Sequence, residues 1–183
     1  MLLLHICCGP CVLYPLEALK NKHILVKGFF YNPNIHPYQE FQLRLEALKK
    51  VSQVEGLEIV WDEKYGLNAF LEEVFFIREK PKRCERCYYL RLKKTAELAT
   101  QLRASAFSTT LLYSPFQQHQ LIKEIAEDLS YRYKIEFYYE DWREGYYLGK
   151  EKALQLGIYR QKYCGCIFSE EERFSPCFKS KKN

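Results

Sequence analysis

The sequence predicts an α/β fold, a three-layer sandwich in which helices cover both faces of a five-stranded, mainly parallel sheet. Two observations support this class: five short apolar runs recur along the chain, and segments with helical periodicity alternate with them. A third is length, because 183 residues suffice for one domain of this kind. We expect residues 1–175 to form one domain and residues 176–183 a flexible basic tail.

The predicted strands are apolar runs that end at turn residues. Residues 2–6 end at the turn Cys7-Cys8-Gly9-Pro10-Cys11, and residues 24–31, rich in Val and Phe, end at Asn32-Pro33-Asn34. The remaining strands are expected at residues 57–61, 105–110 and 134–139. Ligands of parallel sheets bind outside the carboxyl ends of the strands, so the turn after the first strand is the predicted active centre.

The predicted helices fill the intervals between the strands. Residues 12–20 follow the first strand, and a longer helix begins at Pro37 and ends near Gly56. The apolar side chains of that longer helix have helical spacing: Phe41, Leu45 and Leu48. Further helices are expected at residues 67–76, from about Cys84, from about Ser114-Pro115, and at residues 150–156. The final cysteines are expected in a loop after the last helix.

Composition indicates a globular protein of a reducing compartment. Hydrophobic residues make up 48% and charged residues 28%, and the net charge of +5 is a mild basic bias. The apolar opening run stops at His5, too short for a signal peptide, and no run approaches a spanning helix. We therefore expect a cytoplasmic protein without a membrane partner. Eight cysteines in that compartment indicate metal or redox chemistry more than a disulfide framework.

Seven of the eight cysteines fall into three tight groups. The groups are Cys7, Cys8 and Cys11; Cys84 and Cys87; and Cys164 and Cys166. Iron–sulfur clusters need several thiolates that converge on one point, and short spacings such as C-x-x-C let one segment supply two of them. Three such groups in one chain favour an iron–sulfur protein.

The first two groups offer four thiolates for a [4Fe-4S] cluster. Cys84 is expected to open a helix, with Cys87 one turn later, where exposed N–H groups and the helix dipole stabilise thiolates. Cys7 and Cys8 are adjacent, so both can bind one cluster only in an irregular turn, which Gly9-Pro10 favours.

The remaining cysteines fit a second centre. Cys164-Gly165-Cys166 permits either a strained, easily reduced disulfide or chelation of an additional iron. Cys11 could reinforce either centre, and Asp62, just past the third strand, could add a carboxylate or serve as a turn residue. A tetrahedral zinc site on the cysteine pairs is the alternative, but it leaves the remaining cysteines without a role. Cys177 is expected to be an unliganded surface thiol.

A basic segment surrounds the second cysteine group. Eight cationic residues lie in it: Arg78, Lys80, Lys82, Arg83, Arg86, Arg91, Lys93 and Lys94. Such a run is often only a solvated helix face, but here it brackets Cys84 and Cys87, so a polyanion docked on it would reach the cluster. RNA readers stack splayed-out bases on aromatic side chains. The expected RNA contacts are therefore Lys80, Lys82, Arg83, Arg91, Tyr159, Arg160 and Gln161.

Five segments of the sequence form a recognisable set: His5-Ile6-Cys7-Cys8-Gly9-Pro10-Cys11, Tyr31-Asn32-Pro33-Asn34-Ile35-His36-Pro37, Arg83-Cys84-Glu85-Arg86-Cys87 with Arg91-Leu92, Thr109-Thr110-Leu111 before Ser114-Pro115, and Tyr159-Arg160-Gln161-Lys162-Tyr163-Cys164-Gly165-Cys166. Together they resemble the signature of the QueH family of cobalamin-independent epoxyqueuosine reductases. They run in the family's order to about Ser169, so the resemblance covers nearly the whole chain.

The resemblance implies a Rossmann-like, adenine-nucleotide-hydrolase-like (HUP-type) fold and a reaction. The fold's usual phosphate loop after the first strand is replaced by the cysteine turn. The implied reaction is the last step of queuosine synthesis, in which epoxyqueuosine at the wobble position of tRNA loses its epoxide oxygen to give queuosine. It implies a catalytic domain with a [4Fe-4S] cluster, without cobalamin, and an external low-potential electron donor of the ferredoxin or flavodoxin kind.

Two-electron removal of an oxygen also requires a second centre beside the cluster. An additional mononuclear iron would act as Lewis acid, with Cys11 or Asp62 as ligands. Cys164 and Cys166 would be a redox-active pair or ligands of that iron. Two other functions stay open at this point: a cluster-containing tRNA thiolation enzyme of the ATP-pyrophosphatase kind, and a non-catalytic, zinc-stabilised RNA-binding module.

Overall fold

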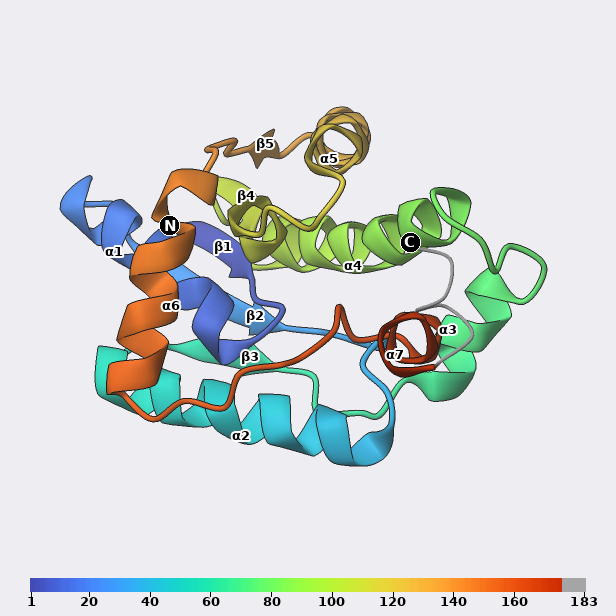
Figure 1. The fold of residues 1–183 in the computed structure, drawn as a ribbon. Helices are drawn as coiled ribbons and strands as arrows, with labels where there is room; N and C mark the ends of the chain where they lie inside the picture. Colours follow the sequence, from blue (N-terminus) through green and yellow to red (C-terminus); the bar gives the residue numbers. More distant parts are fainter. Residues whose placement is uncertain (176–183) are drawn as a thin grey trace.

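A computed structural model describes residues 1–175 of the chain and shows an α/β fold with helices on both faces of one sheet (Figure 1). The five strands are β1 (Leu2–His5), β2 (Val26–Phe30), β3 (Ile59–Trp61), β4 (Ala106–Thr109) and β5 (Glu136–Phe137). All pairings are parallel, in the order β3-β2-β1-β4-β5. The predicted five-stranded parallel sheet is confirmed, and the architecture is Rossmann-like.

The helices form two layers. The α-helices are α1 (Gly9–Asn21), α2 (Tyr38–Glu55), α3 (Leu67–Val74), α4 (Lys82–Gln101), α5 (His119–Tyr133), α6 (Tyr146–Gln155) and α7 (Ile167–Phe174). Helices α1, α2 and α6 pack together on one side of the sheet, and α4 packs with α5 on the other (Figure 1). Two 3₁₀ helices, η1 (Thr110–Tyr113) and η2 (Arg143–Gly145), complete the part of the chain that is described.

Strand β1 lies at the centre of the sheet, and its end places the cysteine turn. Its residues pair with β2 on one side and β4 on the other, with Leu4 opposite both Gly28 and Ser108. The strand is fully buried. Helix α1 begins directly after the turn, so Cys8 is its N-cap residue and Cys11 lies in its first turn. The predicted start of this helix at residue 12 is three residues too late.

Two further helix predictions are wrong at their ends. The helix expected from Ser114-Pro115 begins only at His119, because the hydroxyl of Ser114 accepts the N–H of Phe116 and closes a turn instead. The last predicted helix, residues 150–156, is observed as Tyr146–Gln155.

Helix α7 occupies a segment that was expected to be a loop. Ser169 stabilises its start, since the Ser169 hydroxyl donates to the carbonyl of Cys166 and accepts the N–H of Gly165. The expected basic tail, residues 176–183, and Cys177 lie outside the described residues. No helix within residues 1–175 is long and apolar enough to cross a membrane.

The core on the α2 side is built around aromatic side chains from β2 and its neighbours. The ring of Phe30 is fully buried and lies 5.8 Å from the ring of Phe41 on α2 and 6.0 Å from that of Trp61 on β3. Packing at this point joins α2 to the strands whose carboxyl ends face the site. We therefore expect the loss of this ring to weaken the whole sheet rather than one loop.

Replacing Phe30 with Ala should lower the free energy of unfolding by about 3–5 kcal/mol, because it removes a buried ring and leaves a cavity. Urea unfolding followed by circular dichroism measures this change. Phe116 is the matched control: its ring is 78% exposed, so Phe116→Ala should change stability by less than about 0.5 kcal/mol. Equal effects of the two substitutions would contradict the packing described here.

Candidate metal and redox site

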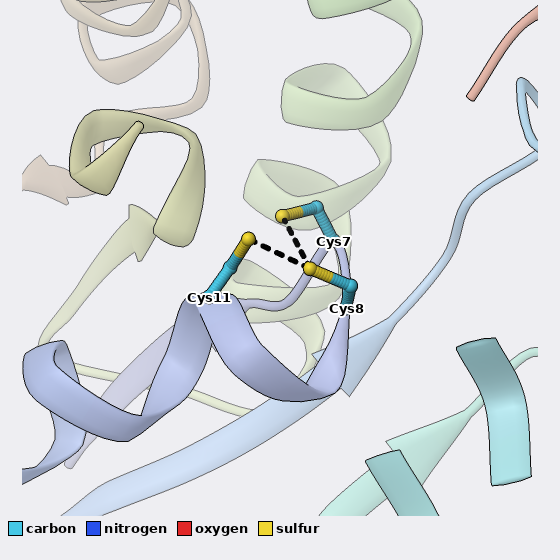
Figure 2. A group of neighbouring side chains, drawn as sticks. All are labelled: Cys7, Cys8 and Cys11. Atoms are coloured by element: carbon cyan, nitrogen blue, oxygen red, sulfur yellow. Dashed lines mark hydrogen bonds between the residues drawn. The ribbon is translucent and has the colours of Figure 1, made fainter. Parts of the chain in front are cut away.

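Three sulfur atoms converge at the carboxyl end of β1. Cys7 follows the strand, Cys8 caps α1 and Cys11 lies one turn later, and their Sγ atoms all lie within 4.8 Å of one another. Figure 2 shows the three sulfurs pointing toward one another from the turn and the first turn of the helix. The Cys8 thiol donates to the Cys11 sulfur over 2.7 Å. Three convergent thiols are a donor set for a thiophilic metal or an iron–sulfur cluster.

Side-chain donors surround these sulfurs. The amide Nε2 of Gln161 lies 3.0 Å from the Cys8 sulfur and 3.6 Å from the Cys11 sulfur, and the Thr110 hydroxyl donates to the Cys7 sulfur over 3.3 Å. Hydrogen bonds of this kind stabilise negative charge on sulfur and tune the potential of a bound metal. The Gln161 side chain thus belongs to the thiol site.

The three thiols share negative charge unequally. Hydrogen bonds from Cys11 and Cys8 hold the pKa of Cys7 well below its usual range. Burial raises the pKa of Cys8, and the hydrogen bonds with Cys7 and Cys8 raise that of Cys11. Cys7 therefore loses its proton most readily of the three thiols, which makes it the readiest metal ligand among them.

The other four cysteines of the described chain gather around the start of α4. Cys87 and Cys166 are buried in a small apolar cluster with Phe70 and Val74 of α3. Burial raises the pKa of Cys87 to about 12, and nearby Cys164 and Cys166 contribute. Burial also raises the pKa of Cys84, again with Cys164 as a neighbour. The final cysteine loop therefore meets the α4 pair, whereas Cys11 lies with Cys7 and Cys8.

Arg91 connects the two groups of thiols. Its guanidinium is 2% exposed, donates to the Cys87 sulfur over 3.2 Å and donates to the Cys87 carbonyl over 3.1 Å. Burial alone would lower the Arg91 pKa, but Cys87, Cys164 and Cys7 raise it. A permanent positive charge thus stands between the groups, where thiolate ligands would need a counter-charge.

Two of the predicted RNA contacts are turned inward, and this corrects the expectation from the sequence. Arg83 is 3% exposed, with its guanidinium donating to the Arg78 carbonyl and to Glu172, and Arg91 points at Cys87. Neither can meet an RNA phosphate without leaving its partners. Lys80 and Lys82 are exposed as expected, and Lys80 forms an ion pair with Glu172.

The remaining predicted residues lie around the same edge of the sheet. The Tyr159 hydroxyl donates to Glu40, and Arg160 is half-buried. Asp62 follows β3 and accepts the N–H of Lys64 over 3.3 Å, the turn contact considered from the sequence. Its carboxylate lines a 310 Å³ cavity between β3 and α4 with Lys94, and it does not belong to the three-thiol group.

His36 is a site residue that sequence reasoning did not single out. Its ring is 1% exposed; Nε2–H donates to the Pro33 carbonyl over 3.0 Å, and Nδ1 accepts the N–H of Ile167 over 3.4 Å. Its backbone N–H donates to the Gly165 carbonyl over 2.8 Å. The only signal in the sequence is a histidine between Asn-Pro-Asn and Pro, which does not reveal that two of its partners, Gly165 and Ile167, lie more than 125 residues away.

Comparison with known proteins gives one consistent result. Residues 2–172 match the model of the family described as epoxyqueuosine reductase QueH. The chain is 38% identical to a protein of that name from Dehalococcoides mccartyi over 173 residues, covering 94% of each chain. It is 36% identical to another from Thermotoga maritima over 179 residues, covering 93% of this chain and 91% of the relative. A relative from Streptococcus pyogenes is 31% identical over 92% of this chain and 69% of its own length.

The buried His36 should make the protein less stable in mild acid. Burial lowers its pKa from 6.5 to about 4. Between these values the unfolded chain binds a proton that the folded protein does not, so stability falls as the pH decreases. From pH 7 to pH 5 this one group should cost about 2 kcal/mol of unfolding free energy.

Urea unfolding at both pH values measures the effect. In His36→Gln the loss between pH 7 and pH 5 should be smaller than in the parent protein by about 2 kcal/mol. The exposed His23 provides the control, since His23→Gln should retain the full pH dependence. An identical pH dependence in all three proteins would show that His36 is protonated in the folded state as easily as in the unfolded chain.

Proposed function

The chain belongs to the epoxyqueuosine reductase QueH family, and on this premise we propose that it removes the epoxide oxygen of epoxyqueuosine at the wobble position of tRNA. The protein is an oxidoreductase. In the balanced reaction, the epoxide takes up two electrons and two protons, both C–O bonds break, and an alkene and water form. The observation that carries the proposal is the family match over residues 2–172, joined to the convergent thiols at the expected end of β1.

The thiols suit the cofactors that this reaction requires. The seven cysteines of the described chain form two groups, one at the end of β1 and one around the start of α4. Gln161, Thr110 and Arg91 place N–H or O–H donors on their sulfurs. We propose that Cys7, Cys8, Cys84 and Cys87 hold a [4Fe-4S] cluster. When bound, the cluster supplies electrons one at a time, and an additional iron supplies a Lewis acid.

The remaining cysteines and Asp62 are assigned to that additional iron or to a redox pair. Cys11 lies with Cys7 and Cys8, and Cys164 and Cys166 lie with Cys87, so ligands for a second centre stand beside both halves of the proposed cluster site. Cys164 is exposed, whereas Cys166 is buried. This difference favours Cys164 as the thiol nearer to substrate. Asp62 would have to exchange its turn contact for a metal.

Residues of the chain would support the reaction in two ways: they stabilise negative charge on the thiols, and they dock the tRNA. Arg91 keeps a positive charge beside Cys87, and Gln161 donates to Cys8 and Cys11, so negative charge on these sulfurs is stabilised without water. Exposed Lys80 and Lys82 precede Cys84, and Arg160 precedes the final cysteine loop. We propose these three cations as contacts of the tRNA backbone, with the base flipped toward the thiols. An external low-potential carrier in the cytoplasm would supply the electrons.

Direct assay tests the function. The anaerobically reconstituted protein, given a strong reductant and tRNA carrying epoxyqueuosine, should yield queuosine, identified by mass spectrometry of the digested nucleosides. Absence of product from protein that contains iron and sulfide would overturn the proposal. Zinc in place of iron in protein purified without oxygen would point instead to an RNA-binding module.

Cluster ligation should depend on the α4 cysteines. Cys84→Ser and Cys87→Ser should each lose most of the iron and acid-labile sulfide, because a four-thiolate site loses one of its ligands. Chemical quantitation of both elements measures the loss, and circular dichroism checks the fold. Thr100→Ala is a control, since its hydroxyl donates only to the Ala96 carbonyl near the other end of α4. Parental iron and sulfide content in both cysteine variants would remove these residues from the ligand set.

The exposed lysines should contribute salt-dependent tRNA affinity. Lys80→Ala combined with Lys82→Ala should weaken binding and reduce the slope of log K against log salt concentration by about 1–2, because fewer counterions are released. Filter binding at several salt concentrations gives the slope. Lys20, in the last turn of α1, and Lys22, the residue that caps its C-terminus, are matched controls, each ion-paired and about half exposed. If the Lys80/Lys82 and Lys20/Lys22 double variants show the same slope of log K against log salt concentration, the tRNA docks elsewhere.

A further inference from the structure

A buried ion pair on α2 faces the final cysteine loop. Arg44 is 2% exposed and Glu40 is 7% exposed, and Arg44 Nε lies 2.7 Å from Glu40 Oε1, one helical turn away. Burying two charges costs solvation free energy, which the pair recovers only if its remaining hydrogen-bonding groups also find partners. The identity of those partners therefore indicates what the pair does.

All of the remaining partners lie in one short segment outside α2. Arg44 Nη1 donates to the carbonyl of Cys164 over 2.8 Å, and Nη2 donates to the carbonyl of Tyr163 over 3.0 Å. The Tyr159 hydroxyl donates to the second oxygen of Glu40 over 2.6 Å. The ring of Tyr163 also lies under the guanidinium, with its centre 5.4 Å from Cζ. Every nitrogen of this guanidinium is thus engaged, two of them on the backbone of the cysteine loop.

The next residue of the loop is held equally closely. Gly165 has φ +147°, a conformation that side chains rarely adopt, and a Cβ there would lie 3.1 Å from both Arg44 Nη1 and Asn34 Nδ2. Its carbonyl accepts the N–H of His36 over 2.8 Å, and the Tyr163 hydroxyl donates to the His36 carbonyl. The backbone between the two final cysteines is therefore packed tightly between α2 and the segment that follows β2.

We propose that Arg44 is a positioning residue: its guanidinium fixes the carbonyl groups of Tyr163 and Cys164, and so sets where Cys164 and Cys166 stand relative to the α4 thiols. For the reaction itself this inference rests on the proposed function. The planar fork of arginine suits two neighbouring carbonyls, which the single ammonium of lysine cannot reproduce. Arg44 is buried behind the loop, so it acts on the thiols through the backbone and not on the substrate.

The electrostatic setting agrees with this role. Burial alone would lower the Arg44 pKa, but Cys8 and Glu40 raise it, and Cys164 contributes further. Arg44 therefore stays charged with thiols of both groups nearby. An apolar pair of similar volume at positions 40 and 44 would fill the same place on α2 at little cost to the fold, whereas replacing Arg44 alone leaves the Glu40 charge buried without its partner. Either change removes the pair of hydrogen bonds that orders the loop.

The first test uses the metal-free, reduced protein and requires no activity. Iodoacetamide labelling followed by peptide mass spectrometry measures how fast the buried Cys166, 7% exposed, becomes alkylated. Arg44→Met should increase this rate about tenfold, the equivalent of one charged hydrogen bond, and Arg44→Lys should lie between Arg44→Met and the parent protein.

Arg132 supplies a matched control. It forms an ion pair of the same i,i+4 spacing with Asp128 at 2.8 Å on α5, but both side chains are exposed. Arg132→Met should leave Cys166 labelling unchanged. If Arg44→Met does not fold, Tyr159→Phe, which removes one hydrogen bond to Glu40, should raise Cys166 labelling by a smaller factor. Unchanged labelling in every folded variant would overturn the proposal.

The second test uses the reconstituted enzyme. Arg44→Lys should lower kcat for epoxyqueuosine tRNA by about tenfold while KM for the tRNA changes by less than about twofold, because the loop thiols are displaced whereas Lys80 and Lys82 of the proposed docking surface are not. A change confined to KM would contradict the positioning role. If no protein, parent included, turns over this tRNA, the proposed function fails, and the labelling result still decides the role of Arg44.

Discussion

Hydrogen bonding of β1 on both edges is the constraint on which the site depends. The strand has only four residues, yet it pairs with β2 and β4 in parallel register and is buried along its whole length. His5, its last residue, holds the carboxyl ends of three strands together: its ring lies 2.9 Å from the Thr109 hydroxyl of β4 and 3.1 Å from the Tyr31 carbonyl after β2. The cysteine turn therefore leaves a rigid point at the centre of the sheet. Helix α1 starts within that turn, so its first residues cannot move independently of the sheet.

Buried arginines give the site its charge. Arg44, Arg83 and Arg91 are each less than 4% exposed, and each points a guanidinium at the loops or sulfurs that surround the cysteines. Positive charge placed inside the protein counterbalances thiolates more strongly than the same charge in water, because the surroundings screen it less. The same burial removes these residues from contact with RNA. The basic character of the segment around α4 is thus divided between an inner set that serves the thiols and an exposed outer set, including Lys80 and Lys82, that faces solvent, with Lys80 paired to Glu172.

Most of the fold could be predicted from local sequence patterns. Most of the contacts between residues of the site could not. Strand positions followed from apolar runs ending at turn residues, and α2 followed from the spacing of Phe41, Leu45 and Leu48. The start of α1 was missed because Gly9 and Pro10 read as turn residues, although Pro is well suited to a helical first turn. Helix α7 was missed because a short helix gains its stability from packing. The cysteines immediately before this helix indicate a ligand-bearing loop, so the sequence predicts a loop there.

What the sequence by itself determined is the set of three cysteine groups, the mainly parallel character of the sheet, and the position of the first group at the end of β1. Spacing along the chain was sufficient there, because ligands in one turn are brought together by local backbone geometry. What only the tertiary structure decided is the partnership between groups. The final pair lies with the α4 pair and not within the first group. Arg44 reaches across about 120 residues of sequence to the loop that carries that final pair. Contacts of this separation depend on how helices pack across the sheet, which no local pattern of residues encodes.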